Sequence, residues 1–280
     1  MKEYKSLYKK FKEQKTDEVF AHFPYDGKSG SSWEKPFEAL SNLAKPEKWN
    51  FTEEEFKQKY NQDYPILTNY LNYTFLRVQD LNLITYSDDG DKACFNTGLQ
   101  TKEEKDIYAT FFRNKEADKF GAPDWTFYTF AESYSNKLSP FQPLPKIATY
   151  ITDPSDLVFD INLGDIDVNY VHILKQNSDR LPEALRSNER LALTALRGAV
   201  ESLYDRIIRN YKVAVPHWYD KKIQLLLPLN LMSDTVADVA LVLDKDKERN
   251  IYRATTILSM DMAYIDARLV ARPDSDWLSI

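Results

Sequence analysis

The chain has 280 residues, 43% of them hydrophobic, which is enough for a buried core in one large domain or two smaller ones and excludes an intrinsically disordered protein. Its net charge of −6 and pI near 5.3 disfavour a protein that grips long duplexes mainly by neutralising phosphates, because that mode needs a basic face. Only seven glycines are present, and they form neither a Walker loop nor a dinucleotide-binding fingerprint.

Residues 1–30 are predicted to form a helical arm and a linker. Over residues 1–23, apolar side chains recur at helical spacing among six lysines, namely Tyr4, Leu7, Tyr8 and Phe11. A polar loop with two glycines follows over residues 25–32. The arm makes residues 1–28 a candidate segment for binding a protein partner, and 14% aromatic content supports the same idea.

Residues 31–280 are interpreted as a single α+β domain. Two or three helices are expected between Trp33 and Leu81. The period then changes to two, and Leu83 to Thr97 reads as a hairpin closed by an Asp-Gly turn. A short helix is expected from Thr101 to Phe112. Strands are expected over Trp125 to Ala131, Ile147 to Ile151 and Leu157 to Ile161.

The second half of this domain contains the clearest helix, from about residue 182 to 209. Further strands are expected over Ile223 to Leu227, Val236 to Leu243 and Tyr252 to Leu258. Helices and strands occur as local clusters, so the sequence predicts N-terminal helices followed by a largely antiparallel sheet packed on the long helix. No internal repeat is visible in the sequence.

Several classes of function lack their sequence signature. The single cysteine, Cys94, excludes an internal disulfide and a thiolate zinc cluster and indicates a reducing compartment. No secretion signal and no long apolar run is present, so a soluble cytoplasmic protein without membrane contact is expected. Nucleophile-elbow and His-Glu-x-x-His patterns are also missing.

Arginine is concentrated in the second half of the chain, where 10 of the 12 arginines lie between Arg180 and Arg272. On a helical wheel Arg186, Arg190 and Arg197 share a sector of roughly 80° that becomes apolar further along. The planar guanidinium suits phosphate recognition, so these residues and Arg180 are candidate phosphate ligands. The alternative is ordinary pairing to Glu183, Glu189 or Glu201, at helical spacing, or to acids of the sheet.

An oxygen-rich row precedes this helix. On a strand, Asp165, Asp167 and Asn169 would share one face, which could hold a divalent cation or accept a proton. A half-exposed strand with a polar face explains the row as well. His172 falls out of phase with the row, and is either a catalytic base or a hydrogen-bonded structural histidine. No metal ligand set is assigned.

Asn96 and Thr97 end the predicted hairpin just before the helix expected at Thr101. Free backbone N–H groups at a helix N-terminus can bind an anion, so both residues are candidate phosphate ligands. A simple capping turn is the alternative interpretation.

The C-terminal segment places charged and aromatic residues within apolar sequence. If residues 260–270 are helical, Asp261 and Arg268 stand two turns apart on one face with Tyr264 beside them. If the segment is a strand, Asp266 joins Tyr264 and Arg268 while Asp261 points away. We expect the segment to lie beside the arginine face of the long helix. Arg272 and Trp277 would form the rim of the site.

The same segments resemble a bacterial family, domain of unknown function 3825. The matching blocks are Trp33 to Trp49, Phe95 to Leu99 with Ile107-Tyr108, His172-Ile173 with Asn177 and Arg180 to Pro182, Gln224 to Leu229, Ala237 to Leu241, and Thr256 through Arg268 to Trp277. The family is similar in context to OST-HTH (LOTUS) and cold-shock RNA-binding domains, which it accompanies. The resemblance therefore implies a role in RNA binding or RNA processing. This chain departs from the family pattern at Asp266, where asparagine is usual, and at His217, where glutamine is usual.

Three functional hypotheses follow. The first is an RNA- or nucleotide-binding domain in which arginines meet phosphate and Tyr264 and Trp277 stack on a base. The arginines expected to meet phosphate are Arg180, Arg186, Arg190, Arg268 and Arg272. The second is a phosphodiester- or nucleotide-processing enzyme that uses Asp261, Asp238 or His172 as base or metal ligand. The third is a protein-interaction module.

Overall fold

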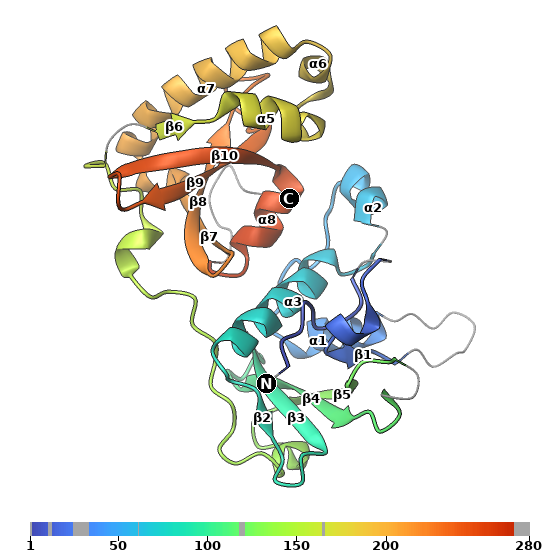
Figure 1. Cartoon of the computed structure of the whole chain (residues 1–280). Helices are drawn as coiled ribbons and strands as arrows, with labels where there is room; N and C mark the ends of the chain where they lie inside the picture. The colour runs from blue at the N-terminus through green and yellow to red at the C-terminus, as the bar shows by residue number, and fades with distance from the viewer. Residues whose placement is uncertain are drawn as a thin grey trace. The chain divides into compact units, whose positions relative to one another are not determined.

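The computed structural model describes residues 2–10, 13–24, 34–60, 62–117, 121–163 and 166–271. The chain divides into two compact units, Met1–Thr149 and Tyr150–Ile280, each with its own five-stranded sheet (Figure 1). The α+β class predicted from the sequence is confirmed. The strands nevertheless form two sheets, where the sequence suggested one sheet in a single domain over residues 31–280.

Unit 1 consists of a sheet with helices on one face. In chain order its elements are η1 (Thr16–Glu18), β1 (Ala21–His22), α1 (Lys35–Leu43), α2 (Glu54–Tyr60), α3 (Pro65–Asp80), β2 (Thr85–Tyr86), β3 (Lys92–Gln100), β4 (Asp106–Arg113), β5 (Trp125–Glu132) and η2 (Asn136–Leu138). The strand order is β1-β5-β4-β3-β2. The pairing of β1 with β5 is parallel, and the other pairs are antiparallel.

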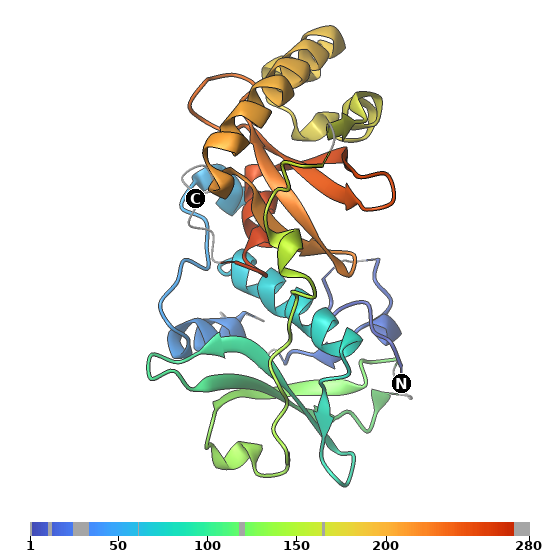
Figure 2. The same ribbon diagram turned by 90° about the vertical axis from the view of Figure 1, so that its left-hand side faces the viewer.

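Aromatic side chains fill the core between this sheet and its helices. Phe75 of α3 lies 4.7 Å from Phe20, and Phe95 of β3 stacks on Phe111 of β4 at 5.7 Å, as ring centroids. The opposite face of the sheet carries a smaller cluster in which Phe141 and Leu138 cover Cys94 and Tyr108. The segment after β5 therefore crosses the face that the helices leave open (Figure 2).

The expected N-terminal helical arm is wrong, because these residues belong to the core of unit 1. Tyr4, Leu7 and Tyr8 are buried, and only the short η1 is helical among residues 2–10 and 13–24. Leu7 N donates to Asn72 Oδ1 of α3 at 2.9 Å, and Tyr4 N donates to Gln79 Oε1 at 2.9 Å. The regularly spaced apolar side chains pack against α3 and the rest of the core, and they do not form an exposed surface for a partner. The loop expected over residues 25–32 lies outside the described residues.

The hairpin predicted for residues 83–97 is confirmed, with Gly90 at φ +71° in its turn. The helix predicted from Thr101 to Phe112 is wrong. Residues 101–105 form the turn between β3 and β4, and β4 occupies the rest. Residues 107–111 of β4 are buried on both faces of the sheet, so the apolar residues do not alternate cleanly and the strand pattern is lost.

Unit 2 also has a five-stranded sheet, with helices on both of its faces. Its elements are η3 (Pro154–Leu157), β6 (Ile166–Val168), α5 (Tyr170–Gln176), η4 (Ser178–Arg180), α6 (Glu183–Arg186), α7 (Glu189–Arg209), η5 (Tyr211–Val213), β7 (Val215–Tyr219), β8 (Lys222–Leu229), β9 (Val239–Asp246), β10 (Ile251–Ser259) and α8 (Met260–Ala267). The strand order is β6-β10-β9-β8-β7, with β6 parallel to β10 and the other pairs antiparallel.

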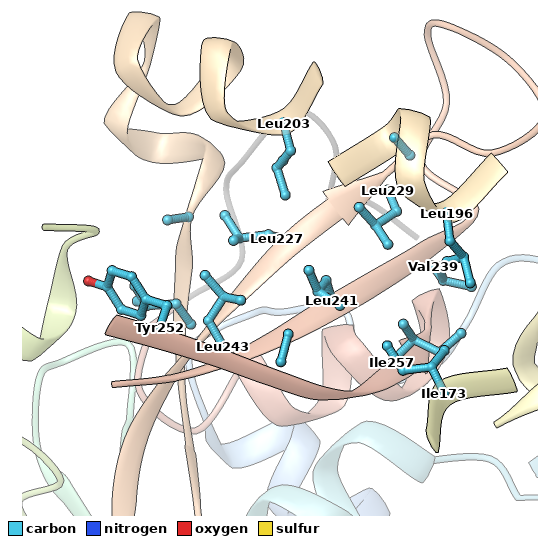
Figure 3. Close-up of a cluster of buried hydrophobic side chains, with 14 of the residues drawn as sticks. Ile173, Leu196, Leu203, Leu227, Leu229, Val239, Leu241, Leu243, Tyr252 and Ile257 are labelled. Carbon is cyan, nitrogen blue, oxygen red and sulfur yellow. The ribbon is translucent and has the colours of Figure 1, made fainter. Parts of the chain in front are cut away.

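The core of unit 2 lies between α7 and the sheet. Leu196 and Leu203 of α7 pack in one cluster with Leu227 of β8 and Leu241 of β9 (Figure 3). Because side chains alternate along a strand, Leu226 points to the other face of the sheet. That other face is covered by α8, which packs against β7, β9 and β10 (Figure 1).

Two differences from the predicted elements of unit 2 have local causes. The long helix predicted from residue 182 is interrupted at Asn188, whose side chain accepts a hydrogen bond from Leu191 N and caps α7. The strands predicted over residues 147–151 and 157–161 are wrong. Ile147 and Ile161 are exposed at 58% and 54%, and Pro154 begins a short 3-10 helix.

The two units share one topology. Each begins with an edge strand, passes through helices, and ends in a four-stranded meander whose last strand lies parallel beside the first. The longest helix of each unit, α3 or α7, immediately precedes this meander or is separated from it by a short 3-10 turn. The repetition exists in the topology although no repeat is visible in the sequence.

Candidate functional site

Two groups can be distinguished among the basic side chains of unit 2. The first group is neutralised by acids, in the pairs Lys222–Asp244, Lys245–Asp156, Lys247–Asp156, Arg249–Asp246, Arg253–Asp246 and Arg209–Asp205. Most of these pairs lie along β8, β9 and β10. Exposed pairs of this kind contribute little to stability, but they leave little free positive charge on that part of the unit.

The second group lies on the helical layer, and we call it the arginine surface: Lys175 of α5, Arg186 of α6, Arg190 and Arg197 of α7, together with Tyr170. Its cationic side chains are exposed, and within the described residues none of them forms an ion pair. The pairing to Glu183, Glu189 or Glu201 that the sequence allowed is therefore not formed. Arg186 Nε donates only to the backbone oxygen of Leu181, at 2.7 Å.

The arginine surface includes an aromatic ring, that of Tyr170, which contacts Arg197. Arg197 Cζ lies 5.5 Å from the centroid of the Tyr170 ring, in cation–π geometry. Tyr170 is the first residue of α5, and α5 packs beside α7 (Figure 1). Arg197 therefore uses a ring face and keeps its N–H donors available, since Glu201, one turn further on, does not bind it.

The arginine surface and the C-terminal segment lie on opposite faces of the unit 2 sheet. α7 covers one face and α8 covers the other (Figure 1). The expected position of α8 beside the arginine face is therefore wrong within this unit. The sequence does not specify which face of the sheet α8 covers. The chain leaves β10 toward one face or the other according to the register of that strand, and register is set by residues elsewhere in the sheet.

The ambiguity over residues 260–270 is resolved in favour of a helix, α8, for which Arg268 is the C-cap residue. Asp261 is fully buried, Tyr264 is 7% exposed, and Arg268 is half-buried. Asp261 and Arg268 are thus two turns apart on one helix, as the helical interpretation required. Arg272 and Trp277, expected at the rim, lie outside the described residues.

Two other candidates, Arg180 and Asp238, have structural roles. Arg180 Nη1 donates to Ile257 O at 2.6 Å and to Thr256 Oγ1 at 3.2 Å, where β10 is bulged. Asp238 Oδ2 accepts from the backbone nitrogens of Leu231 and Met232 at 2.6 and 2.9 Å and so holds the turn after β8. These bonds give partners to backbone groups, namely Ile257 O, Leu231 N and Met232 N, that would otherwise lack a hydrogen bond within the protein.

The oxygen-rich row before α5 does not form as a row. Asp167 lies on β6, but the Asn169 side chain accepts a hydrogen bond from His172 N at 3.0 Å and caps α5. His172 itself is exposed in the first turn of α5. Asp165 lies outside the described residues. Within the described part of the chain, no group of three or more His, Cys, Asp or Glu side chains could hold a metal ion.

Asn96 and Thr97, in unit 1, belong to a strand bulge and not to a helix N-terminus. The register between β3 and β4 shifts after Asn96, whose Oδ1 accepts from Gly98 N at 2.9 Å. Thr97 Oγ1 donates to Ile107 O at 2.7 Å. Both side chains are buried and tie β3 to itself and to β4, so they are not placed to receive an anion.

His217 is a residue whose environment the sequence did not reveal. It lies on β7, is 1% exposed, and neither ring nitrogen has a hydrogen-bond partner. Its pairing with Gln224 places it on the sheet face away from α7. Burial lowers the pKa of His217 from 6.5 to about 4. The alternation along β7 was the only signal in the sequence, and it did not distinguish a buried histidine from an exposed one.

The buried, neutral His217 predicts a pH-dependent stability. The unfolded chain takes up a proton that the folded chain excludes, so stability is complete above pH 6.5 and falls as the pH is lowered toward 4. The slope is about 1.4 kcal/mol per pH unit, and the total loss about 3 kcal/mol. Urea unfolding across this range is expected to show the loss in the wild type and a flatter profile in His217→Gln. Equal slopes in the two proteins would show that another group titrates.

The structure defines an α+β protein with two five-stranded sheets of shared topology and an exposed arginine surface on the second. The family model described as "Domain of unknown function (DUF3825)" matches residues 40–277, and the chain belongs to this family. The match covers most of both units. Searches of curated proteins and of solved structures found no match. Within the described residues, no helix has the length and apolar character needed to cross a membrane.

Proposed function

We propose that this protein binds single-stranded RNA, and that the arginine surface of unit 2 contacts its phosphodiester backbone. The observation that carries the proposal is that some basic residues of unit 2 form ion pairs and others do not. Arg190 and Arg197 are exposed and have no acidic partner among the described residues, whereas six other cations of unit 2 form ion pairs: Arg209, Lys222, Lys245, Lys247, Arg249 and Arg253. Unpaired guanidinium groups offer fixed N–H donors to phosphate oxygens.

The geometry favours a short single strand over a duplex. Arg190 and Arg197 are separated by two helical turns, about 10 Å along the axis, so they would contact different phosphates. Tyr170 lies beside Arg197, and Tyr204, one further heptad along α7, is 40% exposed. Aromatic rings near cations suit unpaired bases. Glu183 and Glu189 are exposed on the same layer and limit the basic surface to a few contacts.

Filter binding of a short single-stranded RNA across a salt series tests the proposal. Two or three phosphate contacts should give a log–log salt slope of about −1.4 to −2.1, at about −0.7 per contact for single strands. Duplex RNA of the same sequence serves as the comparison and is expected to bind more weakly. Absence of binding at low salt, or an affinity independent of salt, would contradict the proposal.

A further inference from the structure

A second surface, on unit 1, displays two neighbouring aromatic rings. Phe112 of β4 is 41% exposed and Tyr128 of β5 is 48% exposed. Their ring centroids are 4.5 Å apart, with an interplanar angle of 54°. Both lie on the sheet face opposite the helices, since the neighbouring Phe111 and Phe127 point into the aromatic core. Single exposed aromatics are common, but two rings in contact form a continuous apolar surface.

A β-bulge places these two rings together. Thr110 pairs with Thr129 and Phe111 pairs with Phe127, so Tyr128 has no partner across the ladder. Such a bulge bends the strand and redirects the side chain of the extra residue. Tyr128 is thereby directed toward Phe112 on the next strand. The position of the two rings is therefore set by the regular pairing of β4 with β5.

The two rings line a cavity of about 210 Å³. Pro140 and Phe141, from the segment after η2, also line the cavity, as do Lys92 and Lys137. Lys92 is the cross-strand partner of Phe112, and Lys137 Nζ lies 5.7 Å from the centroid of the Tyr128 ring. No acidic residue lines the cavity. The pKa of Asp89, which does not line the cavity, is lowered mainly by hydrogen bonds from the Ser87 side chain and the Asp91 backbone. The charge of Lys92 lowers it further, by a smaller amount.

Size and chemistry restrict what this cavity can bind. Small-molecule sites usually enclose roughly 300–1,000 Å³, so a smaller cavity fits part of a ligand, such as one flat ring system. Exposed ring faces stack on flat π systems, and lysines attract anions. Within the described residues neither Lys92 nor Lys137 has an ion-pair partner. A ligand with an aromatic ring and a nearby phosphate satisfies both features.

We infer that this cavity binds the base of a nucleotide, with the ring held against Phe112 and Tyr128 and the phosphate near Lys92 and Lys137. The inference goes beyond the backbone contact proposed for unit 2, because it assigns base recognition to a different unit and to different residues. It does not depend on the arginine surface. Aromatic side chains on neighbouring antiparallel strands are a general means of stacking unpaired bases.

Isothermal titration of the full chain with AMP tests the inference, since a purine offers a large ring face. One AMP per chain is expected to bind. Tyr128→Ala and Phe112→Ala should each weaken binding about 5- to 150-fold, the range found when base stacking is removed. Tyr134→Ala is the matched control, because Tyr134 is 92% exposed in the same unit and does not line the cavity. Tyr128→Phe, which keeps the ring, should bind as the wild type does.

The phosphate contact is tested with the two halves of the ligand. Lys137→Gln should weaken AMP binding and leave adenosine binding unchanged, whereas Lys146→Gln, an exposed lysine outside the cavity, should change neither. Ribose 5-phosphate should bind far more weakly than AMP. Failure of AMP to bind, or unchanged binding by Tyr128→Ala, would overturn the inference. Loss of AMP binding in Arg190→Gln/Arg197→Gln with Tyr128→Ala unaffected would place the nucleotide on unit 2 instead.

Discussion

Replacing Arg190 and Arg197 together by glutamine is expected to lower the affinity for short single-stranded RNA by at least about tenfold, or 1.4 kcal/mol. The reason is that both guanidinium groups are exposed and free of acidic partners within the described residues, so their donors are available to phosphate. The salt slope should also become shallower by about 1.4, at about 0.7 for each lost contact. Filter binding across a salt series measures both quantities.

The control for this experiment removes the same charge from arginines that are already paired. Arg209 contacts Asp205 at 3.8 Å and Arg249 contacts Asp246 at 3.9 Å, and their side chains are 73% and 66% exposed. The variant Arg209→Gln/Arg249→Gln should keep most of the affinity and the original salt slope. Equal losses in the two double variants would indicate a general effect of net charge and would count against the arginine surface.

Replacing Gly98 by alanine is expected to destabilise unit 1 by about 2–5 kcal/mol, from a left-handed residue costing about 1–2 kcal/mol and overpacking costing about 1–3 kcal/mol. Gly98 has φ +76°, and a Cβ built there would lie 2.7 Å from the Tyr70 hydroxyl oxygen of α3. The glycine lies in the bulged part of β3, where the Tyr70 ring of α3 approaches the backbone. Urea unfolding followed by circular dichroism measures the effect.

Two further variants separate the conformational cost from the clash. Gly90→Ala has nearly the same backbone angle, φ +71°, with no atom within 4 Å of the added Cβ, so it should cost only about 1–2 kcal/mol. Tyr70→Phe removes the oxygen that Cβ would meet, and the next ring atom lies at 3.9 Å. In that background Gly98→Ala should cost about as much as Gly90→Ala. If the two glycine variants were equally destabilised in the wild-type background, the close approach of Tyr70 would have no energetic consequence.

These outcomes also change how the Asn96-Thr97-Gly98-Leu99 motif is understood. Its polar residues and its glycine suggested an anion-binding turn, and the same features serve a bulge. The Asn96 oxygen accepts from Gly98 N, and the Thr97 hydroxyl donates across to β4. A motif built of turn-forming residues can bind ligands or its own backbone, and only the pairing of β3 with β4 distinguishes them.

Much of the local structure could be predicted from the sequence because it depends on neighbours in the chain. The hairpin at residues 83–97, the strands near residues 125, 223 and 252, and most of α7 follow from period, turn residues and caps. The alignment of Arg190 with Arg197 follows from helical geometry alone. The prediction failed where an element is buried on both faces, as in β4, or where apolar spacing serves docking onto another element, as in residues 4–8.

The sequence by itself determined the α+β class, the membership of the family, and the concentration of arginine on one helix, because composition and local spacing carry these properties. Only the tertiary structure decided that the strands form two sheets of one topology, since the parallel pairs β1–β5 and β6–β10 join residues far apart in the chain. It also decided which arginines remain unpaired, and it brought Tyr128 to Phe112 through a bulge. Strand register and long-range ion pairs depend on residues that are distant in sequence, so no local pattern specifies them.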